Sequence, residues 1–224
     1  MTTRVSASEF SALGLDDWRV VRRGIEASFR CGSYASAGAF AAVIAERCDA
    51  LDHHAALNLR YPDLLHVVST THYLDAITDR DVTLAGSISD LGRERGFTSM
   101  PTSSTAVEIA IDALDIDAVR PFWKAVLAYV DGKPEEGGAV LDLYDPRTIG
   151  PPIWFQQMHQ PREQRNRIHL DVVVPHDAAE ERLAAALQAG GRLVSDAAAR
   201  AFWVLADAEG NEACICTWQD RSPG

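Results

Sequence analysis

This chain of 224 residues has no long apolar run, only four cysteines and no excess of basic residues. No segment reaches the roughly 18 consecutive apolar residues of a transmembrane helix, so we expect no membrane span. The 32 acidic and 21 basic residues give a net charge of −11. This charge disfavours binding to nucleic acid or to an anionic membrane, since both are polyanions. The first ten residues lack the apolar core of a secretory signal, so we expect a cytoplasmic protein.

The four cysteines, Cys31, Cys48, Cys214 and Cys216, form no C-x-x-C pair. We therefore expect reduced thiols, most of them buried as small apolar side chains. Cys214 and Cys216 alternate on a predicted strand and could bind a soft metal together. Since no second pair accompanies them, two buried thiols are the favoured interpretation.

The first 96 residues predict a self-contained unit of order α-β-β-α-β-β-α. Ser6 and Glu9 form a possible capping box for a short first helix. Apolar periodicity then predicts strands at 18–21, 25–30, 58–61 and 64–71, and helices at 36–50 and 78–95. Residues 97–105 are rich in Ser, Thr and Pro and lose this periodicity, so we expect a linker there.

Residues 106–224 predict a second domain in which one pattern occurs twice. A strand, a helix and further strands are expected at 107–112, 117–129, 139–144 and 153–157, and again at 167–174, 178–189, 192–194, 202–206 and 212–217. Two successive βαβββ modules indicate an internal duplication. The predicted fold class for the whole chain is α+β.

Histidine is concentrated in one stretch, where four of the seven histidines lie between positions 53 and 72. Histidine exchanges protons near neutral pH, so several imidazoles around one site favour acid–base chemistry. His53 and His54 follow a predicted helix, His72 ends a strand, and Asp81 begins the next helix. These points can meet at one edge of a small sheet. His66 lies within a strand and is expected to be structural.

Each of these residues also has a structural alternative. An imidazolium at His53 or His54 could simply stabilise the carboxyl end of the preceding helix. Asp81 lies three residues after Thr78, which is the spacing of a helix capping box. Asp81 could cap the helix, orient an imidazole, or do both.

The motifs Asp52-His53-His54, Tyr61, Thr71-His72 and Thr78-Asp-Arg-Asp81 resemble those of the pterin-4a-carbinolamine dehydratases. The resemblance covers about residues 6–95 and includes the order of the elements. It implies catalytic roles for His53, His54 and His72, with Asp81 in support, and pterin contacts from Asp52, Tyr61 and Thr71. It also implies a homo-oligomer.

The reaction of that family is the loss of water from a 4a-hydroxytetrahydropterin to give the quinonoid dihydropterin. A proton must reach the departing hydroxyl, and another must leave N5 of the ring. The resemblance implies neither metal nor cofactor for this step. The chain departs from the family pattern at Ala55-Ala56-Leu57, where a proline usually follows the paired histidines. This change concerns the wall of the pterin pocket.

The second domain resembles the glyoxalase-like, vicinal-oxygen-chelate family. The resemblance rests on the strand around His169, on Gly190-Gly191 and on the Asp207-x-x-Gly210 turn. Active members of that family usually hold a divalent metal with ligands from the first and last strands of each module. Here Glu108, His169 and Glu212 are the candidate pocket residues, while the family's last-strand glutamate falls on Cys214. Because this ligand set is incomplete, a metal-free pocket or a structural module is favoured.

Three functional hypotheses follow. The leading one is a hydro-lyase acting on a 4a-hydroxytetrahydropterin, with a small-molecule pterin as its partner. An alternative places the activity, or the binding of a small molecule, in the glyoxalase-like domain and leaves the N-terminal domain as a dimerisation module. A third hypothesis is a binding protein that takes up pterin without turning it over.

Overall fold

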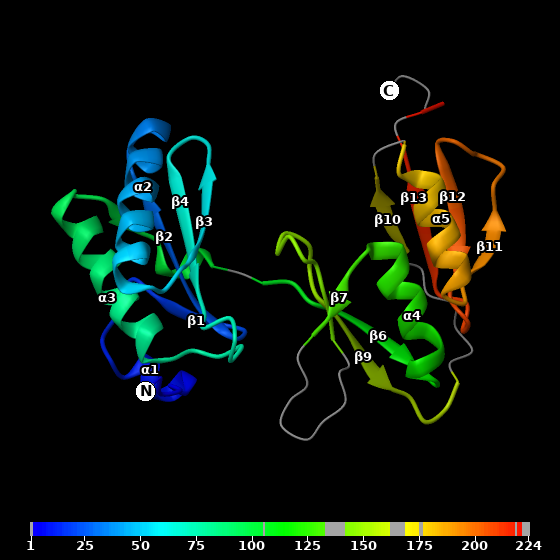
Figure 1. The fold of residues 1–224 in the computed structure, drawn as a ribbon, viewed down its shortest axis with the longest axis horizontal. Helices are drawn as coiled ribbons and strands as arrows, with labels where there is room; N and C mark the ends of the chain where they lie inside the picture. The colour runs from blue at the N-terminus through cyan, green and yellow to red at the C-terminus, as the bar shows by residue number, and fades with distance from the viewer. Residues whose placement is uncertain are drawn as a thin grey trace. The chain divides into compact units, whose positions relative to one another are not determined.

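The computed structural model describes residues 2–104, 106–132, 142–161, 169–174, 177–217 and 219–220. They fall into two compact units, Met1–Ala106 and Val107–Gly224, each with its own sheet structure and apolar core (Figure 1). Among the described helices, none is both long enough and apolar enough to cross a bilayer.

The first unit has the predicted order of elements, followed by one short strand and a 3-10 turn. The elements are α1 (Ala7–Ser11), β1 (Arg19–Val21), β2 (Gly24–Arg30), α2 (Tyr34–Leu51), β3 (Ala56–Arg60), β4 (Leu64–Ser69), α3 (Asp79–Glu94), β5 (Thr98–Ser99) and η1 (Pro101–Ser103). The capping boxes expected at Ser6–Glu9 and Thr78–Asp81 are both confirmed. Each cap satisfies amide groups that a helix start otherwise leaves unpaired.

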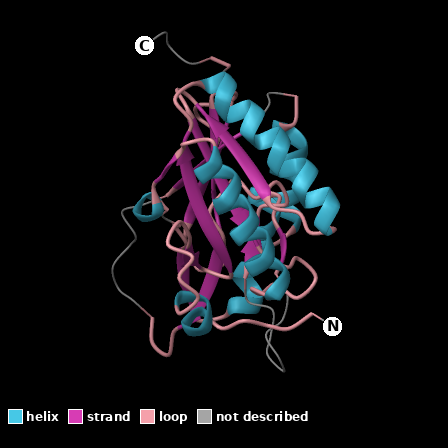
Figure 2. Ribbon diagram, turned by 90° about the vertical axis from the view of Figure 1, so that its left-hand side faces the viewer, coloured by secondary structure: helices cyan, strands magenta, loops and turns pink. Residues whose placement is uncertain are grey.

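The sheet of the first unit is antiparallel, in the order β1-β2-β4-β3, with β5 also paired to β2. Helices α2 and α3 lie together against one face of this sheet (Figures 1 and 2). Side chains alternate along the strands, so odd-numbered residues of β2 and β4 face the helices. Ile25, Phe29, Leu65 and Val67 form the core on that face, and Phe29 packs edge-on against Phe40 of α2.

The structure corrects the prediction of a linker at residues 97–105. Thr98 and Ser99 pair with Arg30 and Phe29 of β2, and the amide of Met100 donates to the carbonyl of Ser28. Strand β1 pairs only with residues 24–26 of β2, so the backbone N–H and C=O groups at the other end of this edge need partners. Residues 98–100 supply those hydrogen bonds. Residues 98–100 therefore belong to the first sheet and not to a linker.

The second unit contains two four-stranded sheets with a helix for each. The elements are β6 (Ile109–Ala113), α4 (Ile116–Leu127), β7 (Val130–Asp131), β8 (Leu143–Tyr144), β9 (Ile153–Gln157), β10 (Leu170–Val173), α5 (Ala179–Gln188), β11 (Arg192–Ser195), β12 (Phe202–Ala206) and β13 (Glu212–Cys216). The sequence missed β7, which has only two residues and no detectable alternation. The predicted strands at 139–144 and 167–174 lie partly outside the described residues.

The two sheets of this unit share one topology. Their orders are β6-β9-β8-β7 and β10-β13-β12-β11, and in each the first and last strands of the module run parallel. The repeated connectivity agrees with the predicted duplication. One core joins the two modules, because Phe122 and Val126 of α4 cluster with Ala186 of α5 and Ile215 of β13.

Candidate active site

The carboxyl end of α2 places the first candidate residue. Asp52 adopts a left-handed conformation with φ of 49°, which ends the helix, and the amide of His53 donates back to the carbonyl of Cys48 at 3.1 Å. His53 turns inward and is only 6% exposed. The sharp end of the helix therefore directs one of the paired histidines into the unit.

The end of β4 supplies two hydroxyl groups to the same place. Ser69 continues the helix-facing row of Leu65 and Val67, and both Ser69 and Thr71 are buried. A polar side chain in that row needs a hydrogen-bond partner, because burial without one costs about 1–3 kcal/mol. Both hydroxyls find it in Asp81.

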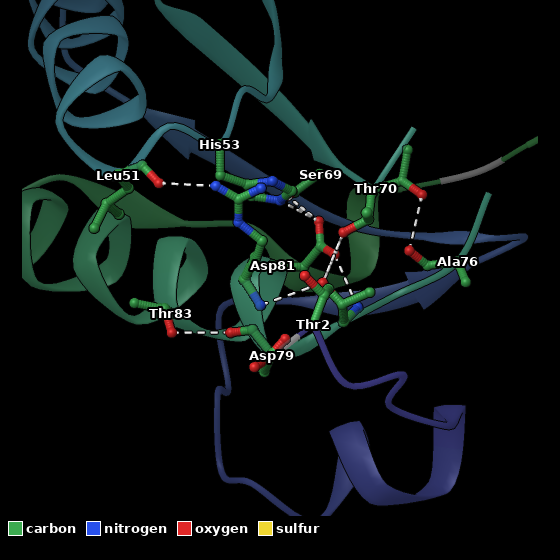
Figure 3. A network of polar contacts seen from close by, with 12 residues as sticks. Thr2, Leu51, His53, Ser69, Thr70, Ala76, Asp79, Asp81 and Thr83 are labelled. Carbon is green, nitrogen blue, oxygen red and sulfur yellow. Dashed lines mark hydrogen bonds and ion pairs between the residues drawn. The ribbon is translucent and has the colours of Figure 1, made fainter. Parts of the chain in front are cut away.

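Asp81 stands at the centre of this network, in the first turn of α3, and is fully buried (Figure 3). Its Oδ1 accepts hydrogen bonds from His53 Nε2 at 2.8 Å and from Ser69 Oγ at 2.6 Å. Its Oδ2 accepts from Thr71 Oγ1 at 2.8 Å and from the amide and hydroxyl of Thr78. Burial raises the pKa of Asp81, but the hydrogen bonds from Ser69, His53, Thr71 and Thr78 outweigh it and lower the pKa. Asp81 is therefore an ionised carboxylate, which accepts hydrogen bonds and donates none.

That ionised acceptor fixes the state of the imidazole. Nε2 of His53 must carry the proton it donates to Asp81, so the neutral ring has its lone pair on Nδ1. Within the described residues, hydrogen bonds to this ring are found only at Nε2. The arrangement leaves Nδ1 of His53 as a proton acceptor of defined orientation.

Arg80 ties the two helix ends together. Its Nη2 donates to the carbonyls of Leu51 and Asp52 and to the carboxylate of Asp52, at 3.3 Å for Leu51 and 3.2 Å for the carboxylate. These groups end α2, whereas Arg80 belongs to the first turn of α3. The guanidinium thereby holds the backbone that precedes His53 next to the helix that carries Asp81.

His54 and His72 are exposed, in contrast to His53. His54 Nε2 lies 3.0 Å from Asp49 Oδ1 at the surface of α2. Each exposed histidine directly follows a member of the buried network, His54 after His53 and His72 after Thr71. Consecutive Cα atoms lie about 3.8 Å apart, so both imidazoles originate beside the Asp81 network.

Three other predicted residues lie in different surroundings. Thr71 belongs to the buried network, but the side chain of Asp52 is 94% exposed and pairs with Arg80. Tyr61 is 87% exposed in the turn between β3 and β4. Neither Asp52 nor Tyr61 contacts Asp81 through a described hydrogen bond.

His66 lies on the opposite face of the sheet from the helices. Its Nδ1 is 2.9 Å from Ser28 Oγ, and its Nε2 is 3.6 Å from Glu26 Oε2. Burial lowers the pKa of His66, and Arg60 adds to this effect. The expected structural role of His66 agrees with this placement.

Ser69 and Arg80 are site residues that the sequence argument missed. Ser69 could have been found as a single polar residue in the alternating apolar row of Leu65 and Val67. Arg80 lies within the Thr78-Asp-Arg-Asp81 motif, but the motif by itself assigned it no role, because an arginine in the first turn of a helix is usually ordinary surface charge.

In the second unit, the structure groups His169 with Asp171 and Cys214. One ligand atom from each lies within 4.8 Å of the others, and His169 Nε2 is 3.3 Å from Asp171 Oδ1. Burial raises the pKa of the Cys214 thiol to about 11, and Asp171 adds to the effect. The predicted pocket residues Glu108 and Glu212 are not members of this group.

The strand register tests the two-module metal site implied by the glyoxalase-like resemblance. Ile109 pairs with Ile153 in the first module as Leu170 pairs with Ala213 in the second. The counterpart of Cys214 is therefore Trp154, which offers no ligand atom. The residues present do not fit a metal shared equally by the two modules.

The first unit is thus a small α+β fold whose helices enclose a buried histidine–carboxylate pair, which is an arrangement suited to proton transfer. The family model described as pterin 4 alpha carbinolamine dehydratase matches residues 3–91, and one described as glyoxalase-like domain matches residues 108–216. A Streptomyces coelicolor protein named "Putative pterin-4-alpha-carbinolamine dehydratase" is 33% identical over 82 residues, which are 37% of this chain and 81% of that protein. A Mycobacterium leprae protein with the same name is 29% identical over 79 residues, covering 35% and 83%.

Two solved structures each match part of this chain. The transcriptional coactivator/pterin dehydratase of Brucella melitensis shares 27% identity at a TM-score of 0.37, covering 40% of this chain and 98% of its own. A glyoxalase/bleomycin resistance protein/dioxygenase family enzyme from Burkholderia phytofirmans PsJN shares 19% identity at a TM-score of 0.39, covering 49% and 95%. The chain belongs to the pterin-4a-carbinolamine dehydratase family through its first unit, and its second unit is similar to the glyoxalase-like domain family.

Proposed function

We propose that the first unit dehydrates a 4a-hydroxytetrahydropterin to the quinonoid dihydropterin by histidine acid–base catalysis. The observation that carries this proposal is the buried pair of His53 and Asp81, joined at 2.8 Å between Nε2 and Oδ1. Membership of the dehydratase family supports the substrate class. Neither a metal nor a cofactor is needed for the step.

His53 acts as the base in this mechanism. With Nε2–H held by Asp81, Nδ1 takes the proton from N5 of the pterin ring. The positive charge that forms on the imidazole is stabilised by the Asp81 carboxylate, which remains ionised because four neighbours donate to it.

An exposed histidine acts as the acid. His54 or His72, in its protonated form, gives a proton to the 4a-hydroxyl as the bond from C4a to oxygen breaks and the C4a–N5 double bond forms. Water leaves, and the two histidines return to their starting states by exchange with solvent. The exposure of His54 and His72 favours that exchange for the acid. Each well-placed proton transfer contributes about 10²- to 10⁴-fold in rate.

The decisive experiment measures dehydration of 4a-hydroxytetrahydrobiopterin, generated in the cuvette, by the full chain and by single variants. We expect His53→Ala to lower kcat/KM at least about 100-fold, and His54→Ala or His72→Ala to lower it about 10- to 100-fold. His66→Gln is the matched control, because His66 lies on the opposite face of the sheet. It should retain full activity.

Three results would contradict the proposal in different ways. Unchanged activity in all three variants of His53, His54 and His72 would disprove the histidine acid–base mechanism. Tight binding of pterin without turnover by the unaltered chain would instead assign the first unit to binding alone. Activity that persists in the first three variants but is lost on His169→Ala would move the chemistry to the glyoxalase-like domain.

A further inference from the structure

The second unit brings a thiol, an imidazole and a carboxylate onto one face of a sheet. Asp171 of β10 and Cys214 of β13 are direct partners on parallel strands, and His169 lies two residues before Asp171. Side chains two residues apart share a face of a strand. Leu170, Val172, Ala213 and Ile215 point to the core beneath α5, so the other three residues lie on the opposite face.

The spacing of the three groups suits one metal ion. Their ligand atoms lie within 4.8 Å of one another. Ligands at zinc bond lengths in a tetrahedron are about 3.2–3.8 Å apart. The side chains of His169 and Asp171 are 52% and 59% exposed, so they are free to rotate. Small rotations can bring their ligand atoms from within 4.8 Å to zinc-ligand spacing around the buried thiol of Cys214.

The chemical types of the donors favour zinc over harder cations. Thiolate and imidazole are the donors that Zn²⁺ prefers, whereas magnesium and calcium take oxygen ligands. Three protein ligands leave the fourth tetrahedral position for water. The exposure of His169 and Asp171 places that position at the solvent side of the group.

The first module provides a comparison within the same chain. Register equivalence relates His169, Asp171 and Cys214 to Glu108, Ala110 and Trp154. Only Glu108 of that second set carries a ligand atom. The donors are therefore concentrated in one module, which differs from the arrangement that the family resemblance implies.

We propose that His169, Asp171 and Cys214 form a Zn²⁺ site contained within the second βαβββ module, with Asp171 as its third protein ligand. This site is separate from the pterin chemistry of the first unit, so each can be tested without the other.

The test uses the full chain, freed of metal by chelator and then dialysed against Zn²⁺. Metal analysis and titration calorimetry should give one Zn²⁺ per chain for the unaltered protein. Cys214→Ser should weaken zinc binding at least about 100-fold, and Asp171→Asn about 10-fold or more, as loss of one ligand from a three-ligand site predicts. Because Asp171 is exposed, its variant should fold even if the buried cysteine variant does not.

The matched control is Cys216→Ser, which replaces a second buried thiol on the same face of the same strand and should keep zinc. Replacement of Zn²⁺ by Co²⁺ gives an independent readout, since a cobalt–thiolate bond produces a charge-transfer absorption band that Cys214→Ser should abolish. Failure to bind stoichiometric zinc would overturn the site. Equal loss in Cys216→Ser and Cys214→Ser would overturn the proposed ligand set.

Discussion

Ser69 Oγ lies 2.6 Å from Oδ1 of Asp81, the oxygen that also accepts from His53. The Ser69 hydroxyl is 3.5 Å from His53 Nε2, so the two donors are neighbours on one acceptor. Asp81 therefore serves two purposes that the sequence left open. It caps α3 through Thr78, and it holds the imidazole of His53.

Replacing Asp81 by Asn should damage both activity and stability. The amide keeps one acceptor oxygen but turns a second acceptor into a donor, which leaves buried hydroxyl and imidazole groups without a partner. We expect kcat/KM to fall at least about 100-fold. The free energy of unfolding should fall by about 2–3 kcal/mol, measured by urea denaturation.

Asp79→Asn is the control for that variant. Asp79 is an exposed residue in the same helical turn, and among the described hydrogen bonds its carboxylate accepts only from the amide of Thr3. Its replacement should leave activity intact. Equal losses in both variants would show that acidic charge in the first turn of α3, and not the contact with His53, explains the effect.

Removing the hydroxyl of Ser69 should shift the pH dependence of the reaction. Ser69 helps to lower the pKa of Asp81, so Ser69→Ala should raise that pKa. The acid limb of kcat/KM against pH should move to higher pH, because Asp81 must be ionised to hold His53. Ser28→Ala removes a hydroxyl that bonds to His66 on the opposite face and should leave the profile unchanged.

The stability of the first unit should fall in acid through Asp81. The pKa of Asp81 is lower in the folded chain than the usual 3.8, so the unfolded chain binds the proton more readily. The stabilisation is complete above the unfolded pKa and is lost as pH falls through the folded value. Urea denaturation followed at the buried Trp18, the one tryptophan of the first unit, should show this loss below about pH 4.

The same measurement on Asp81→Asn checks the assignment. Its difference in stability from the unaltered chain should shrink as pH falls from about 5 to 3. A difference that stays constant over that range would mean that another carboxylate governs the acid transition.

Substitution of Arg80 should act on the position of His53. Arg80→Gln removes the charged donor to the carbonyls of Leu51 and Asp52, and we expect kcat to fall by about 3- to 10-fold and stability by about 1–2 kcal/mol. Arg93→Gln breaks only an exposed ion pair with Asp90 and should change little. Steady-state kinetics of the two variants decide whether the hydrogen bonds from Arg80 to the end of α2 contribute to activity.

Gly191 should tolerate no side chain. A Cβ atom there would lie 2.4 Å from Cδ2 of Phe122 and 2.8 Å from the carbonyl of Ala186. Gly191→Ala should therefore destabilise the second unit by about 1–3 kcal/mol, measured by thermal unfolding. Gly86→Ala, in open space within α3, should instead stabilise the first unit by about 0.5–1 kcal/mol.

Local chemistry made much of the first unit predictable. The Thr78–Asp81 capping box fixed the start of α3, and alternation fixed the faces of β4, which correctly set His66 apart from the helices. The burial of His53 beside exposed His54 was not predictable, since it depends on the left-handed turn at Asp52. The catalytic roles, the cytoplasmic location and the homo-oligomer stay predictions.

Long-range contacts decided what the sequence could not show. The short strand at Thr98–Ser99 forms because the edge of β2 is open, not because of its own composition. The grouping of Asp171 with Cys214 likewise depends on the register of two strands separated by more than a helix and a hairpin. Alternation within one segment carries no information about either pairing.

Because the two βαβββ modules share one strand register, each position in one module can be compared with an equivalent position in the other module of the same molecule. Position by position, the same backbone carries Cys214 in one module and Trp154 in the other. Exchanging side chains between equivalent positions would therefore separate what the scaffold contributes from what its side chains contribute, with temperature, folding state and concentration identical for both halves of the comparison.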